Sequence, residues 1–481
     1  MNFKLVINVL AKTFLIEAVL MFAPLIVGFV YGENTYLGFL VPIAGLTAAG
    51  VGLSFIKPES KVIRPKEGFT IVALAWILIS VIGTLPFIIN GEIPSFIDAL
   101  FETVSGFTTT GSSVLSDVES LSKSAGFWRI FTHFIGGMGV LVFILAVLPD
   151  NSAGTIHIFR AESPGPTAQK FVSKMRFTAG ILYLIYLGLT LIEFIMLLCG
   201  GMNGYDAILH AFSTAGTGGL STKNAGIAAF NSTYIEMVIA VFMFLFGINF
   251  NVFYLIIIGN FAKAFCSEEL RTYFCIVVVA TIAVAISLLG TAQNFADAIR
   301  LSFFQITSIG STTGFTTADF NLWPDFAKVV IVILSMIGAC GGSTCGGIKI
   351  ARLIILTKSS ATDLKKVLSP RTVATAKFEG EQLDAFTVNS VRSYFILWFA
   401  IVILSTLILS LDPFGDMLSD FTGTIACIGN VGPGLGAVGP ASNYSAYAWY
   451  SKLTLSVVMI AGRLEIFPII MLFNYKTWKR G

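Results

Sequence analysis

Apolar runs long enough to cross a bilayer alternate with polar connections along almost the whole chain. Ten such runs occupy residues 5–31, 36–56, 69–90, 126–149, 177–200, 232–259, 273–291, 325–356, 391–411 and 447–474. Each is near or above the roughly 20 residues that a transmembrane helix needs. The pattern predicts an all-α membrane protein with ten crossings.

Between these runs the chain repeats one motif four times, a short apolar segment with an acid near its start and then a turn rich in Thr, Ser and Gly. The copies are DALFETVSGFTTTGSS from Asp98, DAILHAFSTAGTGGLST from Asp206, DAIRLSFFQITSIGSTTGFTT from Asp297 and the looser DMLSDFTGTIACIGNVGPGLG from Asp416. Each copy lies between two apolar runs. We therefore expect two leading helices and then four parallel helix–pore loop–helix repeats around a pseudo-fourfold pore.

The predicted division of the chain follows from this count, and its orientation follows from the basic residues. The segments are a two-helix extension over 1–60 and pore repeats over 61–150, 151–262, 263–358 and 359–481. Basic residues gather in every second connection, for example at 57–66 and 358–377. By the positive-inside rule both termini are expected in the cytoplasm, and the hairpins enter from outside. The repeats then share one orientation, unlike the inverted repeats of many transporters.

The composition is that of a membrane protein, and it argues against several kinds of function. The chain is 55% hydrophobic and 12% charged, whereas soluble domains carry about 25% charged residues. A net charge of +3 is too small to indicate nucleic-acid binding. The six cysteines lack metal-ligand or disulfide spacing. HExxH, GxSxG and paired acids within a run are also missing, so no enzyme is expected.

The four polar turns are the candidate site. Non-helical backbone survives at membrane depth only where protein buries it or it lines water. Glycine lets successive carbonyls face one side, and four such turns can replace the water shell of a monovalent cation. The half-helices would point their partly negative ends at the same place, with Asp98, Asp206 and Asp297 as caps at the positive ends. Ordinary extracellular loops are the alternative, but they would not need matching places in four copies.

The turn motifs TTTG, GTGGLST, STTGFTT and GNVGPGLG resemble those of the Trk/Ktr/HKT superfamily of potassium transporters. The two leading helices and the chain length place the sequence nearest to the Trk membrane-subunit branch. The resemblance covers essentially the whole chain and includes PKEGF at 65–69, RAESPGP at 160–166 and GRLE at 462–465. It implies K+ uptake across the bacterial cytoplasmic (inner) membrane, with K+ as the transported ion.

The resemblance also assigns residues to the K+ filter. Carried onto this sequence, they are Thr109, Thr110, Gly111, Thr217, Gly218, Gly219, Thr312, Thr313, Gly314, Asn430, Val431 and Gly432. Members with Ser at the first filter glycine tend to pass Na+, so Gly111 favours K+. The register of the second turn stays open by one residue, because two glycines stand there.

The apolar run at 325–356 is interrupted by GACGGSTCGG at 338–347. Each Gly costs about 1 kcal/mol relative to Ala in a helix, and the freed backbone groups need water or protein. We expect a flexible gate below the filter, as the family's intramembrane loop implies, with close packing of small residues as the alternative. The residues assigned to the gate are Gly338, Gly341, Gly342, Ser343, Thr344, Gly346, Gly347, Lys349 and Arg463.

Arg463 lies deep inside the last apolar run. An arginine at the bilayer centre costs roughly 2.5–3.5 kcal/mol on insertion scales, so we expect it to face water or a partner. It is either a positive barrier below the filter or a structural anchor that bonds loop carbonyls or a carboxylate. We further expect Lys349 to pair with Glu465 when the pore is shut.

Two transport mechanisms remain open, channel-like uptake driven by the membrane potential and secondary K+ symport with H+ or Na+. A symporter would carry acids at its substrate site, and the four turns contain none. The resemblance also implies a homodimer that binds a cytosolic ring of nucleotide-binding, TrkA-like regulatory subunits. The basic connections at 150–176 and 357–390 are the expected docking surface.

Overall fold

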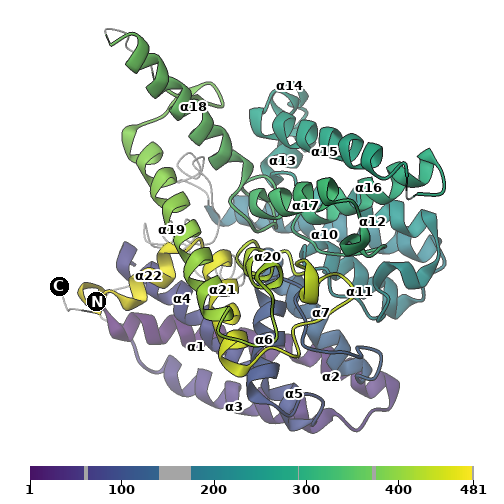
Figure 1. Ribbon diagram of the computed structural model, residues 1–481. Helices are drawn as coiled ribbons and strands as arrows, with labels where there is room; N and C mark the ends of the chain where they lie inside the picture. The colour runs from purple at the N-terminus through teal and green to yellow at the C-terminus, as the bar shows by residue number, and fades with distance from the viewer. Residues whose placement is uncertain (59–62, 140–174, 291, 371–374, 479–481) are drawn as a thin grey trace.

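Figure 1 shows the computed structural model, an assembly of helices. The structure describes residues 1–58, 63–139, 175–290, 292–370 and 375–478. The RAESPGP motif, the end of the fourth predicted crossing and most of the 150–176 connection lie outside these residues.

Six helical segments of the described residues are long and apolar enough to cross a bilayer, or seven if one bent pair is a single span. The six are α1–α2 (Phe3–Leu20, Phe22–Tyr31), α3 (Tyr36–Ser54), α4–α5 (Pro65–Ile82, Leu85–Ile89), α10 (Met175–Cys199), α15 (Glu268–Ser287) and α19 (Ala385–Leu409), and the bent pair is α12–α13 (Thr233–Phe246, Phe250–Ile257). The other three predicted crossings fall on helices that are too short or not apolar enough to pass the same test. These are α7 (Lys123–Gly137), α17 and α18 (Asp325–Ile337, Ile350–Leu368), and α21 and α22 (Trp449–Arg463, Phe467–Phe473).

Each polar motif begins with a short helix, and these four half-helices are α6 (Phe96–Phe107), α11 (Gly204–Ala215), α16 (Phe295–Gly310) and α20 (Met417–Ile428). Their N-caps are Ser95, Asn203, Asn294 and Asp416, whose side chains accept the backbone N–H three residues later. The prediction that Asp98, Asp206 and Asp297 are caps is therefore wrong. These aspartates lie in the first turn, where a carboxylate is favoured by the helix dipole without the extended backbone that a cap needs.

The repeats close into a ring. Within each repeat the half-helix packs on the helix that follows it, in the pairs α6–α7, α11–α12, α16–α17 and α20–α21. We call α7, α12, α17 and α21 the inner helices. Each also packs on the half-helix of the next repeat, in the pairs α7–α11, α12–α16, α17–α20 and finally α21–α6. The last pair returns to the first repeat, so the predicted pseudo-fourfold arrangement is confirmed.

Within the described residues, the inner helices of the second, third and fourth repeats are interrupted, although the sequence predicted a break only in the third. Helices α12 and α13 meet at 91° across residues 247–249. Helix α17 ends at Ile337 as predicted, and α21 ends at Arg463, before two residues with positive φ, Glu465 and Ile466. The sequence signals for the missed breaks are Gly247 and Pro468, because each disfavours a continuous helix.

The leading helices and the ends of the chain lie on one flank of the ring. Helix α1 packs on α3 and α4, and α2 packs on α7. The rings of Phe3 and Trp478 stack with centroids 6.4 Å apart, so both ends of the chain lie together (Figure 1). The remaining elements are α14 (Phe261–Phe265), α23 (Tyr475–Trp478), the 3-10 helices Gly226–Phe230, Phe320–Leu322 and Gly436–Val438, and the antiparallel strands β1 (Lys377–Phe378) and β2 (Glu381–Gln382).

Candidate functional site

The turn after each half-helix has the same backbone. In the first turn Thr109 has φ +55° and Gly111 has φ +82°. The equivalent pairs with positive φ are Thr217 and Gly219, Thr312 and Gly314, and Asn430 and Gly432. Positive φ is uncommon outside glycine and unfavourable for a β-branched residue, so its recurrence marks one shared conformation. It also places Gly219, and not Gly218, at the position of Gly111.

The N–H groups of the turns are tied back to the half-helices. The residue between each positive-φ pair donates its N–H to the carbonyl five residues earlier, at 2.8–2.9 Å. These bonds are Thr110 to Ser105, Gly218 to Ser213, Thr313 to Ser308 and Val431 to Ala426. The donors thereby satisfy orphan carbonyls at the helix ends, and the carbonyls of the turns remain available for other contacts.

The four turns meet edge to edge, and we call residues 108–111, 216–219, 311–314 and 429–432 together the filter ring. A Cβ on each filter glycine would run into the carbonyl oxygen of the next turn. The contacts would be Gly111 to Gly218 at 2.0 Å, Gly219 to Thr313 at 2.0 Å, Gly314 to Val431 at 2.0 Å and Gly432 to Thr110 at 2.7 Å. The equivalent carbonyls therefore follow one another around a closed ring, and only glycine fits the four positions.

The predicted filter residues all belong to this ring. The four filter glycines line a cavity of about 190 Å³ above it, which we call the outer cavity. Its wall includes Arg129 of α7, which pairs with the buried Glu102 of α6 at 2.5 Å. Glu102 also accepts hydrogen bonds from Ser113 and from the N–H of Val114. This ion pair braces the chain where it leaves the first turn.

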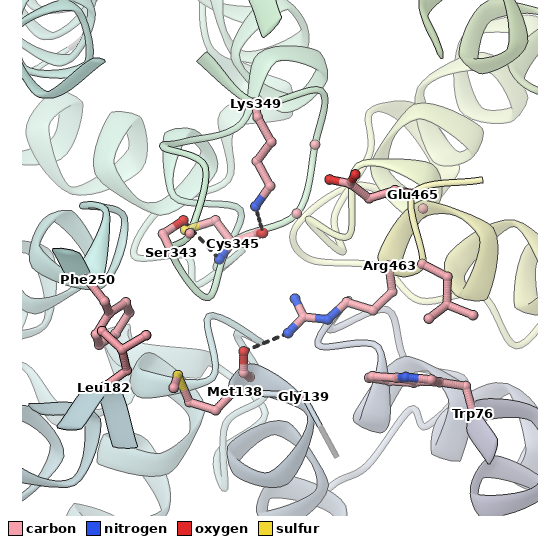
Figure 2. A pocket seen from close by; sticks show the side chains of 16 residues that line it. Trp76, Met138, Gly139, Leu182, Phe250, Ser343, Cys345, Lys349, Arg463 and Glu465 are labelled. Carbon is pink, nitrogen blue, oxygen red and sulfur yellow. Dashed lines mark hydrogen bonds between the residues drawn. The ribbon is translucent and has the colours of Figure 1, made fainter. Parts of the chain in front are cut away.

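Below the ring, residues 338–347 form an intramembrane loop that lines a second cavity of about 70 Å³, the lower cavity (Figure 2). The N–H of Gly346 donates to Thr312 Oγ1 at 2.8 Å, and a Cβ on Gly346 would lie 2.4 Å from the carbonyl oxygen of Gly429. The loop therefore lies directly under the third and fourth turns. Its other end is held by Glu269 of α15, which accepts the N–H of Gly341 at 2.6 Å.

Arg463 points into the lower cavity from the end of α21 (Figure 2). Its Nη1 donates to the Thr344 carbonyl at 2.7 Å and to Thr109 Oγ1 at 3.2 Å. Its Nη2 donates to the carbonyls of Gly136 and Gly137 at 2.6 and 2.7 Å. One guanidinium thus joins the intramembrane loop, the first filter turn and the end of α7. These contacts match the expected anchor, and the charge stands where a barrier would act.

Lys349 lines the lower cavity too, but its predicted pairing with Glu465 is wrong. Its Nζ donates to the carbonyl of Cys345, within the loop (Figure 2). Glu465 pairs instead with Arg352. Arg352 lies in the first turn of α18 and its guanidinium rests 4.1 Å from the ring centroid of Tyr394, which holds it in reach of the carboxylate. The lower cavity is therefore lined by two cationic side chains and one acid that is already paired.

Known proteins resemble this chain in sequence and in overall fold. A family profile described as "TrkH: Cation transport protein" matches residues 41–479. The chain belongs to the TrkH family. It is 34% identical to the Trk system potassium uptake protein TrkH of Vibrio parahaemolyticus and 32% identical to that of Escherichia coli K12, over 100% of both chains in each case. The crystal structure of the potassium transporter TrkH from Vibrio parahaemolyticus matches with a TM-score of 0.89, at 32% identity over 100% of both chains.

Membership of the TrkH family confirms the resemblance seen in the turn motifs. The family is one of transport proteins, in agreement with the expectation that the chain is not an enzyme. Three residues that contact the first turn or the intramembrane loop were not predicted from the sequence. Glu102 and Arg129 lie in apolar segments, and such placement signals a buried pair. Glu269 follows a polar connection, so nothing in the sequence links it to the loop.

Proposed function

We propose that this chain takes up K+ across the cytoplasmic membrane through a channel-like pore at the filter ring. The observation that carries the proposal is the closure of four equivalent turns, each with its glycine against the carbonyl of the next. Rings of carbonyl oxygens replace the hydration shell of K+ in selective filters. The names of the relatives, which are potassium uptake proteins, support the same ion.

The proposed ion contacts are the twelve filter residues. They are Thr109, Thr110, Gly111, Thr217, Gly218, Gly219, Thr312, Thr313, Gly314, Asn430, Val431 and Gly432. An ion would enter from the outer cavity, pass the ring and reach the lower cavity. The driving force would be the membrane potential, worth about 2.3 kcal/mol per elementary charge per 100 mV.

The intramembrane loop is the proposed gate, with Arg463 and Lys349 as its charged elements. Arg463 is bonded to the Thr344 carbonyl, so the loop and the guanidinium would leave the pathway together. While they remain, two positive charges beneath the ring oppose the exit of a cation, because charges interact strongly where water is scarce. Opening would require the loop to give up its bonds to Thr312, Glu269 and Arg463.

Symport with H+ or Na+ is the second candidate. The described residues along the pathway give it little support. The buried acids Glu17 and Glu193 lie on α1 and α10, and neither lines the outer or the lower cavity. Glu465 does line the lower cavity, but its carboxylate is paired with Arg352. A proton-coupled site would place a carboxylate that is free to titrate on the ion path. The arrangement of the described residues therefore favours the channel-like mechanism.

We infer the placement and partners of the chain from the same features. The two ends of the chain lie together, as expected if both termini are cytoplasmic. The Trk names support a multicomponent system, and we propose a homodimer that binds a cytosolic, TrkA-like regulatory ring. The described part of the basic connection at 357–390 contains the last turns of α18 with Lys365 and Lys366, and both are exposed.

The proposal is tested by purifying the chain and reconstituting it in liposomes loaded with K+. An imposed voltage should drive K+ flux in proportion to its size, and a pH or Na+ gradient without voltage should drive none. Protein-free liposomes with the same gradients are the control. Strict dependence of K+ flux on a proton or Na+ gradient would establish the symport mechanism instead, and no K+ flux under any gradient would refute the proposed function.

A further inference from the structure

The second filter turn lacks side chains that brace two of the other turns. In the first and third turns, a pair of hydroxyl groups two residues apart closes each bend at 2.8 and 2.7 Å. The pairs are Thr108 with Thr110 and Ser311 with Thr313. The equivalent residues of the second turn are Gly216 and Gly218, which carry no side chains.

The space left by these two glycines is filled by His133 of α7, from the preceding repeat. A Cβ on Gly218 would lie 1.8, 2.2 and 2.3 Å from Nδ1, Cγ and Cε1 of the His133 ring. A Cβ on Gly216 would lie 2.3 Å from the His133 carbonyl oxygen. Gly218 does not have a positive φ, so it is glycine because the imidazole needs the room.

His133 is held firmly in this place. Its side chain is fully buried, and Nδ1 lies 3.4 Å from Oγ of Ser213, the residue whose carbonyl accepts the N–H of Gly218. One helical turn after His133, a Cβ on Gly137 would lie 2.7 Å from the Cα of Gly216. Arg463 holds the carbonyls of the same helix end. The ring is therefore positioned by α7 and not by the turn that it supports.

We propose that His133 is a positioning residue of the filter, which supplies from the first repeat the bracing that the second turn lacks. The inference rests on the proposed K+ conduction through the filter ring. The carbonyl of Gly218 lies against Gly111, so a shift of the second turn would change the spacing of ring oxygens. Filters discriminate between K+ and Na+ through the number and placement of such oxygens. Oxygens that contact an ion stay in place only where the residues behind them are well packed.

The test is a double-mutant cycle read out as the K+ over Na+ permeability ratio in liposomes. We expect His133→Ala to lower the ratio by about tenfold, which corresponds to about 1.4 kcal/mol. Gly218→Thr should also lower it, because the new side chain collides with the imidazole. The double variant should recover most of the ratio, because the introduced threonine would fill the space vacated by the ring, as Thr110 and Thr313 fill theirs.

A general loss of structure would not produce this pattern. Gly310→Ala is the matched control, because nothing lies within 4 Å of the Cβ that it adds, and it should keep the wild-type ratio. The inference is overturned if His133→Ala keeps the wild-type ratio, or if the double variant is no better than the worse single variant. If His133→Ala does not fold, recovery of folding and selectivity by the double variant supports the inference, and failure to recover overturns it.

The two proposals fail in different ways. Wild-type protein that carries no K+ refutes the proposed function, and the positioning role of His133 falls with it. Wild-type protein that selects K+, together with an unaffected His133→Ala variant, refutes the role of His133 alone.

Discussion

At the scale of single residues, backbone strain is concentrated where the filter ring meets the structures below it. Thr109, Thr217, Thr312 and Asn430 have φ between +53° and +55°, which costs roughly 1–3 kcal/mol for each residue. Three of the four side chains also hold groups outside their own turns. Thr109 accepts from Arg463, Thr312 accepts from Gly346, and Asn430 donates to the Met459 carbonyl. The strained residues thus link the ring to Arg463, to the intramembrane loop and to α21.

The first filter glycine gives a prediction about selectivity. Gly111 has φ +82°, and a Cβ there would lie 2.0 Å from the Gly218 carbonyl oxygen. Gly111→Ser must therefore displace the second turn and open the ring. We expect the K+ over Na+ permeability ratio to fall by about tenfold, or about 1.4 kcal/mol, as measured by reversal potentials in planar bilayers. An unchanged ratio would count against the assignment of the filter.

Arg463 gives a prediction that separates its charge from its hydrogen bonds. Arg463→Gln removes the charge and most of the four bonds to the loop, the ring and α7. We expect basal K+ flux to rise about tenfold, because the barrier and the anchor are lost together. Arg463→Lys keeps the charge without the planar fork of donors, so an intermediate flux would show that the anchor contributes.

The control for this pair is Arg392→Gln. Arg392 forms an exposed ion pair with Asp363 far from the cavities, so its replacement should leave flux at the wild-type level. If Arg463→Gln conducts no more K+ than Arg392→Gln in equally folded protein, Arg463 is neither barrier nor anchor of a closed gate.

At the scale of elements, the sequence predicted crossings better than breaks. The third inner helix carries five glycines within residues 338–347, a signal strong enough to predict an interruption. The fourth breaks at Glu465 and Ile466, which have φ +58° and +68°. No propensity predicts a positive φ at isoleucine. Ile466 is fully buried, so its conformation depends on packing that only the folded protein creates.

Glu269 gives a prediction about the position of the loop. Its carboxylate is buried in the first turn of α15 and accepts the N–H of Gly341 at 2.6 Å. Glu269→Ala leaves that buried donor without its partner, at a cost of about 1–3 kcal/mol. Because the loop then sits less stably under the ring, we expect basal K+ flux to rise by about tenfold per 1.4 kcal/mol lost, as measured in liposomes at fixed voltage.

Glu268→Ala is the matched control on the same helix turn. Glu268 pairs with Lys358 at 2.6 Å, and both side chains are about one-third exposed, so the pair is worth little. The K+ flux of Glu268→Ala should equal that of wild type. Equal flux in Glu269→Ala and Glu268→Ala would show that the contact with Gly341 does not hold the gate shut.

At the scale of the whole molecule, the pore exists only because the last repeat returns to the first. The sequence shows four copies and predicts a ring, yet it does not identify the contacts that seal the ring. They join residues more than 300 positions apart, such as Ser112 Oγ with the Gly432 carbonyl at 3.1 Å. Their partners lie in segments of unrelated sequence, Asp98 in α6 and Lys452 in α21 among them. Pairing across such distances is set by the closed geometry, so only the structure reveals it.

The seal between the first and fourth repeats gives a prediction about stability. Lys452 Nζ lies 2.6 Å from Asp98 Oδ1, and the two side chains are 9% and 29% exposed. Exposed ion pairs are worth about 0–1 kcal/mol, whereas breaking a buried pair costs about 3–5 kcal/mol. We expect Lys452→Met to lie between these limits, at about 1–3 kcal/mol. The thermal midpoint in detergent should fall, and K+ selectivity should weaken as the fourth turn separates from the first.

Lys328→Met tests whether this effect belongs to the seal. Lys328 pairs at 3.2 Å with Asp325, whose side chain is 96% exposed, within a single helix. Its loss should change neither the midpoint nor the selectivity, because no repeat boundary depends on it and the charge removed is the same. If Lys452→Met and Lys328→Met behave alike, the ring is closed by packing of α21 on α6 alone. A midpoint lowered only in Lys452→Met, with weaker selectivity, would show that the ion pair helps to hold the four turns in register.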